Sequence, residues 1–218
     1  MPSSSKLLGL AVAASAAAIA SRRPLQQWGA TTSEVAMLLP GDELIPSATV
    51  IATRAISIAA PAAAVWPWLV QLGYGRGGFY SHDRLERLVG LDIHSAERVK
   101  EQWQDMAVGD SIALAPQVEL RVALLEPGCH LVLEGDPDSV PGGGEAPYDF
   151  SWAFVLLPGE THNDTHTRLV VRERYAPHSI AARVLVEAIQ PVSWLMSAAM
   201  LRGIRDRAEQ RWQTSASA

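Results

Sequence analysis

Residues 58–66 read IAAPAAAVW, and this stretch marks a point where a strand ends and a helix begins. The preceding residues, 49–58, mix β-branched and alternating apolar side chains, which favours a strand. Pro61 stands where a helix can start, because the first turn of a helix does not use the backbone N–H that proline lacks. We therefore predict a strand over 49–58 and a helix over 61–70, which Pro67 should bend or shorten.

Downstream of this helix, the pattern changes from helical to strand-like. A glycine-rich bend at residues 73–78 leads to a second short predicted helix over 81–88. Five segments with strand character then follow, separated by Pro, Gly, Asp and Asn clusters. They cover residues 111–115, 119–125, 130–134, 150–157 and 167–175. Short strands connected in this way predict an antiparallel meander, in which the long connection 135–147 is expected to be a mobile loop.

The last predicted element is a long helix over residues 179–212, where apolar residues recur at helical spacing. Pro191 should kink it. Arg183 and Glu187 argue against a membrane span, although residues 188–201 carry no charge. Together these elements predict an α+β fold: a curved antiparallel sheet wrapped around a long C-terminal helix, with two short helices after the first strand.

The order of these elements resembles the helix-grip arrangement of the SRPBCC (START-like, polyketide cyclase-like) superfamily, and the resemblance covers about residues 49–212. The stretch 58–66 resembles the opening of that family, in which a strand leads to an apolar-Pro-x-x-x-Val-Trp helix. Strings at residues 66–71, 75–81, 103–105 and 150–154 resemble a functionally uncharacterised, actinobacterial-type branch. The resemblance implies a cavity between sheet and helix, which different members use to bind lipids, sterols, polyketides or plant-hormone-like ligands. Some members catalyse polyketide cyclisation, and others only bind or transport.

Length and composition limit the other possibilities. The 218 residues fit one domain with an additional terminal segment. We divide them into an N-terminal apolar segment (1–28), a lead-in helix and turn (29–48), the helix-grip domain (49–212) and a disordered tail (213–218). A net charge of -5 with dispersed basic residues argues against nucleic acid as a partner. Cys129 is the only cysteine, so no intrachain disulfide can form.

The N-terminal apolar run, residues 7–21, has three interpretations that the sequence leaves open. It could be a secretory signal cleaved near Ala20, so that the protein is exported. It could be a membrane tether, although its fifteen residues fall short of the roughly 20 that span a bilayer. It could also be a docked terminal helix. For a tether, Arg22 and Arg23 would place the domain on the cytoplasmic side, which is the localisation we expect.

Three ionisable residues are candidates for catalysis. Tyr80 and His82 follow the glycine-rich bend and could protonate or orient a carbonyl group. Glu173 shares a strand face with Leu169, Val171 and Tyr175 because side chains alternate along a strand. If that face lines a cavity, the carboxylate needs a partner, and Arg76 or Arg84 from the bend and the following helix could supply it. The alternative is a solvent-exposed face with ion pairs to the neighbouring arginines.

The expected ligand-binding residues are large aromatic side chains together with Glu173. They are Trp68, Tyr74, Phe79, Tyr80, Trp103, Trp152, Phe154, Glu173, Tyr175 and Trp194. We expect no metal, since residues 162–166 form a polar turn without fixed ligand geometry, and no cofactor, since residues 75–78 lack the Walker lysine.

These observations predict a protein that binds an apolar or aromatic small molecule in an internal cavity without covalent chemistry. One alternative is a cyclase- or hydrolase-like enzyme that uses Tyr80, His82 and Glu173. Another is a partner-binding domain displayed at a membrane through residues 7–21. The sequence leaves the oligomeric state open. If Glu173 serves a ligand, Glu173→Gln should weaken binding and change stability little.

Overall fold

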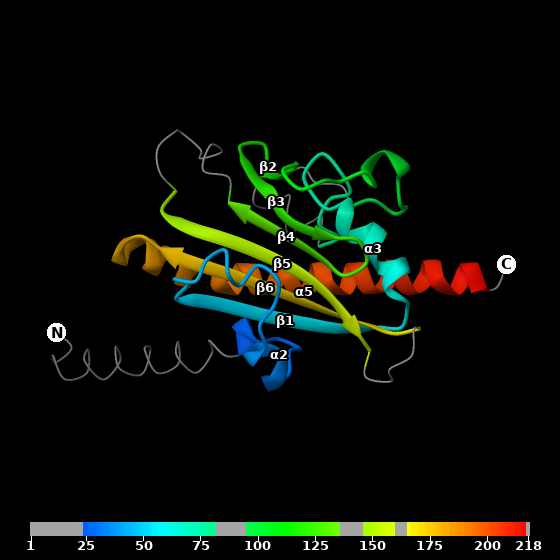
Figure 1. Cartoon of the computed structure of the whole chain (residues 1–218), viewed down its shortest axis with the longest axis horizontal. Helices are drawn as coiled ribbons and strands as arrows, with labels where there is room; N and C mark the ends of the chain where they lie inside the picture. Colours follow the sequence, from blue (N-terminus) through cyan, green and yellow to red (C-terminus); the bar gives the residue numbers. More distant parts are fainter. Residues whose placement is uncertain (1–23, 82–94, 136–145, 160–164, 217–218) are drawn as a thin grey trace, which may run out of the picture.

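The computed structural model describes residues 24–81, 95–135, 146–159 and 165–216. In these residues the chain forms an antiparallel sheet wrapped along one long helix, α5 (Ile180–Ala216) (Figure 1). The predicted α+β helix-grip arrangement is therefore confirmed. The strands in chain order are β1 (Val50–Ile58), β2 (Ser111–Ala115), β3 (Val118–Glu126), β4 (His130–Gly135), β5 (Tyr148–Pro158) and β6 (Thr167–Pro177).

The sheet has the order β1-β6-β5-β4-β3-β2, and all neighbouring strands are antiparallel. Strands β2 to β6 form the predicted meander, and the first strand joins its far edge by pairing with the last. In that pair Ala52 stands opposite Glu173 and Arg54 stands opposite Val171. This pairing brings residues more than a hundred positions apart onto one face.

Two short helical elements precede the meander. Helix α3 (Ala62–Val70) begins directly after Pro61 and continues through Pro67, so the proline does not end it. The one-turn 3-10 helix η1 (Glu101–Trp103) lies just before β2. The second predicted helix, over 81–88, lies outside the described residues apart from Ser81, and most of the connection 135–147 also lies outside them.

One face of the sheet packs against α3 and α5 and holds the main hydrophobic core. The core residues are contributed by several strands and by both helices, and each large apolar side chain contributes about 1.5–3 kcal/mol when fully buried. They include Ile58, Leu69, Phe154, Val171, Leu201 and Ile204, all at most 1% exposed.

The opposite face of the sheet is covered by the lead-in segment, residues 29–48, which crosses β1 and β6 (Figure 1). It contains helix α2 (Thr32–Ala36), which begins with a capping box between Thr31 and Glu34. A second core cluster forms between this segment and the sheet, consisting of Leu39, Ala55, Val132, Ala153, Val155 and Val170. The segment is therefore a third layer of the domain, whereas the sequence analysis treats it as a lead-in before the core.

Arginines on the outer face of β6 hold this layer in place. Arg168 is paired with Glu34 at 2.7 Å, and Arg172 is paired with Asp42 at 2.6 Å. Arg174 reaches the other oxygen of Asp42 at 3.2 Å. The arginines that alternate with Glu173 along β6 therefore face the lead-in segment and not solvent.

The domain includes residues that the sequence analysis assigns to the N-terminal apolar segment. The Trp28 carbonyl accepts a hydrogen bond from Ala55 N at 3.1 Å, and the Arg202 guanidinium lies 4.7 Å from the centre of the Trp28 ring. The Leu25 carbonyl accepts from Arg54 Nε at 3.1 Å. Residues 24–28 are thus packed on the domain, and the expected boundary after residue 28 is wrong.

Helix α5 is longer than predicted and runs through Pro191 to Ala216. Residues 213–216 belong to the helix and not to a disordered tail, because the hydroxyls of Thr214 and Ser215 donate to carbonyls four residues earlier. Of the described helices, α5 is long and apolar enough to cross a membrane, with 39% of its apolar window buried. The core helix of a soluble protein meets the same criterion, and α5 packs on β1, β6 and α3.

Candidate functional site

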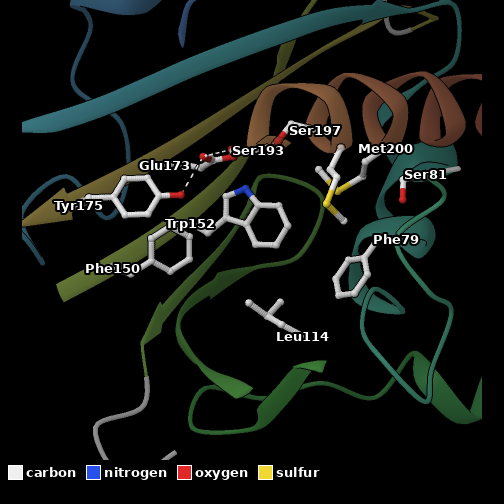
Figure 2. A pocket seen from close by; sticks show the side chains of 11 residues that line it. Phe79, Ser81, Leu114, Phe150, Trp152, Glu173, Tyr175, Ser193, Ser197 and Met200 are labelled. Carbon is white, nitrogen blue, oxygen red and sulfur yellow. Dashed lines mark hydrogen bonds between the residues drawn. The ribbon is translucent and has the colours of Figure 1, made fainter. Parts of the chain in front are cut away.

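A cavity of about 200 Å³ lies between α5, the sheet and the glycine-rich bend (Figure 2). Most of its wall is aromatic or aliphatic, and its polar groups are Glu173, the Tyr175 hydroxyl and three serines. The lining residues are Phe79, Ser81, Leu114, Phe150, Trp152, Glu173, Tyr175, Ser193, Met196, Ser197 and Met200.

Secondary-structure periodicity explains how these side chains meet. On β5 and β6 the lining residues are two positions apart, Phe150 with Trp152 and Glu173 with Tyr175, because alternate residues of a strand share a face. On α5 the lining residues are Ser193, Met196, Ser197 and Met200, which are three or four positions apart and share one helix face. The wall is thus made by rigid elements on the sheet side and on the helix side.

The apolar wall is a set of rings in contact. The Phe79 and Trp152 ring centres are 6.4 Å apart, and those of Phe150 and Tyr175 are 4.8 Å apart. Met196 and Met200 add flexible thioether side chains to the wall. Such a surface suits a flat apolar or aromatic molecule, because rings offer large contact areas in fixed orientations.

A buried polar cluster centred on Glu173 forms one end of the cavity (Figure 2). Glu173 is only 3% exposed, and Arg54 on β1 is fully buried. Arg54 Nη1 donates to Glu173 Oε1 at 2.6 Å, and Ser197 Oγ donates to the same oxygen at 2.9 Å. Ser193 Oγ and the Tyr175 hydroxyl donate to Oε2 at 2.7 and 3.1 Å. Four donors, one of them the cation Arg54, occupy the acceptor sites of this carboxylate.

This cluster settles which cation pairs with Glu173. The expected partners were Arg76 or Arg84, but the partner is Arg54, which stands diagonally across the β1–β6 ladder. Arg76 instead donates to the carbonyls of Val70 and Trp103. Arg84 lies outside the described residues. The expectation that Glu173 shares the cavity face with Leu169, Val171 and Tyr175 agrees with the structure, since all four are buried on that side.

Tyr175 remains a neutral phenol in this setting. Burial, and after it the negative charge of Glu173, raise the pKa of Tyr175 well above its usual value. The phenol therefore keeps its proton across the physiological range and continues to donate to Glu173.

Tyr80 has a different role from the catalytic one considered from the sequence. Its hydroxyl donates to the Trp68 carbonyl at 3.1 Å, so it is directed at α3. Burial raises the pKa of Tyr80, which disfavours proton exchange near neutral pH. Its φ of 55° is the left-handed conformation that non-glycine residues seldom adopt. Phe79 and Ser81, on either side of it, line the cavity. His82 lies outside the described residues.

The remaining predicted ligand-binding residues lie elsewhere. Trp68 and Phe154 are in the main core, and Trp68 meets Tyr80 edge to face at 5.7 Å. Tyr74 packs on the rim of that core. Trp103 lies on η1 under the Lys100 ammonium group, 4.5 Å from the ring centre. Trp194 is half-buried on α5 and is not among the residues that line the cavity.

Neither Arg54 nor the four residues of the α5 wall were predicted from the sequence. The spacing of Ser193, Met196, Ser197 and Met200 was the available signal, because residues three, four and seven apart share a helix face. The parts of the chain that the structure describes contain no group of three His, Cys, Asp or Glu side chains placed to hold a metal ion. Of the polar turn 162–166, only Thr165 and His166 lie within the description.

The fold and the site define a helix-grip domain with an apolar cavity closed at one end by a buried ion pair. No family model and no curated protein matches the chain. Solved structures with a similar arrangement include a protein from Nitrosospira multiformis, with 16% identity, a TM-score of 0.46, and coverage of 71% of this chain and 96% of that one.

Two further solved structures share a similar arrangement. Norcoclaurine synthase from Thalictrum flavum, in complex with dopamine and hydroxybenzaldehyde, is 13% identical with a TM-score of 0.42, covering 76% of this chain and 94% of that one. DynU16, a putative protein in the dynemicin biosynthetic locus, is 17% identical with a TM-score of 0.41, covering 70% of this chain and 46% of that one. None of the three reaches a TM-score of 0.5, so the function has to be inferred from the site itself.

Proposed function

We propose that this protein binds an apolar or aromatic small molecule in the cavity beneath α5, without covalent chemistry. The observation that supports the proposal is the cavity of about 200 Å³ with rings of Phe79, Phe150 and Trp152 in its wall. At the packing density of protein interiors, ~0.74, this space holds roughly 150 Å³ of ligand atoms, about the size of a two-ring aromatic molecule. Ligands of that size bind with roughly 4–8 kcal/mol, which corresponds to dissociation constants from about millimolar to micromolar.

The hydrogen bonding of Glu173 favours binding over acid–base catalysis. Its oxygens already accept from Arg54, Ser193, Ser197 and Tyr175. A general base needs a lone pair within reach of the substrate proton, and this carboxylate has none to offer while the cluster is intact. A cyclase- or hydrolase-like reaction remains the alternative function, and conversion of a bound ligand during incubation would favour it.

Native mass spectrometry of the protein as expressed is the first test, because a copurifying molecule reveals both occupancy and mass. Titration with naphthalene, followed by tryptophan fluorescence, is the second. Leu114→Trp adds a ring to the cavity wall and should weaken naphthalene binding at least tenfold. Val108→Trp makes the same change at an exposed position and should leave the affinity within twofold. Equal affinity in wild type and Leu114→Trp would contradict binding in this cavity.

Membrane attachment through residues 7–21 is a separate proposal about where the protein works. It is supported by the uncharged length of this run and by the two arginines that follow it. Exposed apolar side chains on the first half of α5, among them Ile180, Val184 and Val192, are compatible with a position close to lipid. In this proposal the domain lies on the cytoplasmic side.

A further inference from the structure

The hydrogen-bond donors and acceptors at the polar end of the cavity can be assigned one by one. A serine or tyrosine hydroxyl has a single proton to donate. Ser193 and Tyr175 both donate that proton to Glu173 Oε2. Ser197 donates to Oε1, and its oxygen also accepts from Arg54 Nη1 at 3.2 Å. The protons of all three hydroxyls are therefore used inside the cluster.

The oxygens of these hydroxyls differ in whether they can still accept a hydrogen bond. Among the described residues, no donor reaches the oxygen of Ser193 or of Tyr175, whereas the oxygen of Ser197 is engaged by Arg54. Ser193 is half-buried and lines the cavity, so its oxygen can accept a hydrogen bond from a ligand. Since Arg54 balances the charge of Glu173, this end of the cavity favours a neutral donor over a cation.

Trp152 adds one donor beside these acceptors. Its Nε1 is buried and has no hydrogen-bond partner among the described residues. In Figure 2 this nitrogen lies on the edge of the indole ring that is turned toward the Glu173 cluster. A buried N–H without a partner costs about 1–3 kcal/mol, which an acceptor on a ligand would recover after a small shift of the ring.

A hydroxyl is an uncharged group that donates and accepts at one atom, and its oxygen is a stronger acceptor than the nitrogen of an aromatic amine or the sulfur of a thiol. We infer that the cavity selects a neutral one- or two-ring aromatic molecule with a hydroxyl group. The hydroxyl donates to Ser193 Oγ and accepts from Trp152 Nε1–H. This inference rests on the proposed function, since it names the ligand class of the same cavity.

Two probes of matched shape test the inference. 2-Naphthol and 2-methylnaphthalene differ by a hydroxyl in place of a methyl group, so the ratio of their affinities isolates the hydroxyl. Equilibrium dialysis gives this ratio for wild type and for three variants. Ser193→Ala should lower the ratio of 2-naphthol to 2-methylnaphthalene affinity by roughly three- to tenfold, because the acceptor is lost. Trp152→Phe, which keeps a ring but removes the N–H, should lower it by a similar factor.

Ser215→Ala is the matched control. It removes a serine hydroxyl from the same helix, but that hydroxyl is exposed, donates to the Arg211 carbonyl at 3.0 Å and is not among the groups that line the cavity. The ratio should therefore stay within twofold of the wild-type value. A urea unfolding curve for each variant establishes that it is folded; if Ser193→Ala is unfolded, the result for Trp152→Phe decides.

The outcomes separate the inference from the proposed function. If both probes bind wild type and neither Ser193→Ala nor Trp152→Phe changes the ratio, the hydroxyl assignment is wrong while the cavity still binds apolar molecules. Equal changes in Ser193→Ala and Ser215→Ala would also overturn the assignment, since the effect would then not come from the cavity. If neither probe binds wild type, the proposed function itself fails.

Discussion

Replacing Glu173 with glutamine removes the negative charge beside Arg54, a fully buried cation. Arg54 is fully buried and its Nη1 lies 2.6 Å from the carboxylate. The glutamine amide keeps the size of the side chain, but it carries one acceptor oxygen where the carboxylate has two. The amide nitrogen would also face donors, either Arg54 with Ser197 or Ser193 with Tyr175.

Breaking a buried ion pair by neutralising one partner costs about 3–5 kcal/mol, because the other charge stays buried and unpaired. Whole domains are stable by only about 5–15 kcal/mol. We therefore expect Glu173→Gln to lower the free energy of unfolding by about 3–5 kcal/mol and the melting temperature by roughly 6–20 °C for a domain of this size. This expected loss is larger than the sequence alone predicts, which is little change in stability if Glu173 serves a ligand.

Equilibrium unfolding in urea, followed by circular dichroism and with the m-value checked, measures this loss. Glu126→Gln is the control, because Glu126 is an exposed carboxylate near His130 and should change stability by less than about 0.5 kcal/mol. Arg54→Met combined with Glu173→Gln should recover part of the loss, since no unpaired cation remains. A Glu173→Gln protein within 1 kcal/mol of wild type, at an unchanged m-value, would refute the buried-pair reasoning.

Three other predictions concern the layer outside the sheet and the N-terminus. Burial alone would raise the pKa of Glu34, but hydrogen bonds from Arg168 and Thr31 outweigh it and lower this pKa below its usual value of 4.5. The ionised Glu34 therefore stabilises the fold above pH 4.5, and this stabilisation is lost as the pH falls further. The difference in unfolding free energy between wild type and Glu34→Gln should shrink from pH 6 to pH 3. A constant difference would show that the charge of Glu34 does not contribute to stability. Deleting residues 1–23 should leave stability unchanged. Deleting residues 1–28 should lower the free energy of unfolding by roughly 2–4 kcal/mol, because Trp28 is lost. Equal stability of the two truncated proteins would contradict the packing of residues 24–28. Fusing residues 1–28 to a cytosolic reporter should move the reporter to the membrane fraction, and a fully soluble reporter would rule out the tether.

Local sequence patterns predicted most of the secondary structure. The strand Ser111–Ala115 agrees with the prediction at both ends, and β1 differs by one residue, because β-branched alternation ends at Gly, Asp and Pro signals that act within a few positions. The third layer was not predictable in this way. Residues 29–48 mix apolar and polar side chains without a clear period. They are bound to the sheet by the second core cluster and by arginines on β6, which pair with Glu34 and Asp42 over a distance that no local window includes.

The candidate site was predictable only in part, for a related reason. Alternation along β6 correctly grouped Glu173 with Tyr175, and both line the cavity. An aromatic residue in the sequence does not show whether its side chain lines the cavity or fills the core. Trp152 lines the cavity, whereas Phe154, two positions further along β5, is buried in the main core. The identity of the cation depended on the register of β1 against β6, and that register follows from packing of the complete sheet.

The pairing of the first strand with the last sets the order in which the chain can fold during translation. Arg54 leaves the ribosome 119 residues before its partner Glu173. At ~5–20 residues per second this interval lasts roughly 6 to 24 s. Throughout it, β1 is an apolar strand without a neighbour, and the segment ahead of it has no surface to cover. Nascent chains halted before β6 should therefore depend on chaperones, whereas release of the complete chain provides β6 and α5 together and allows the N-terminal third to fold last.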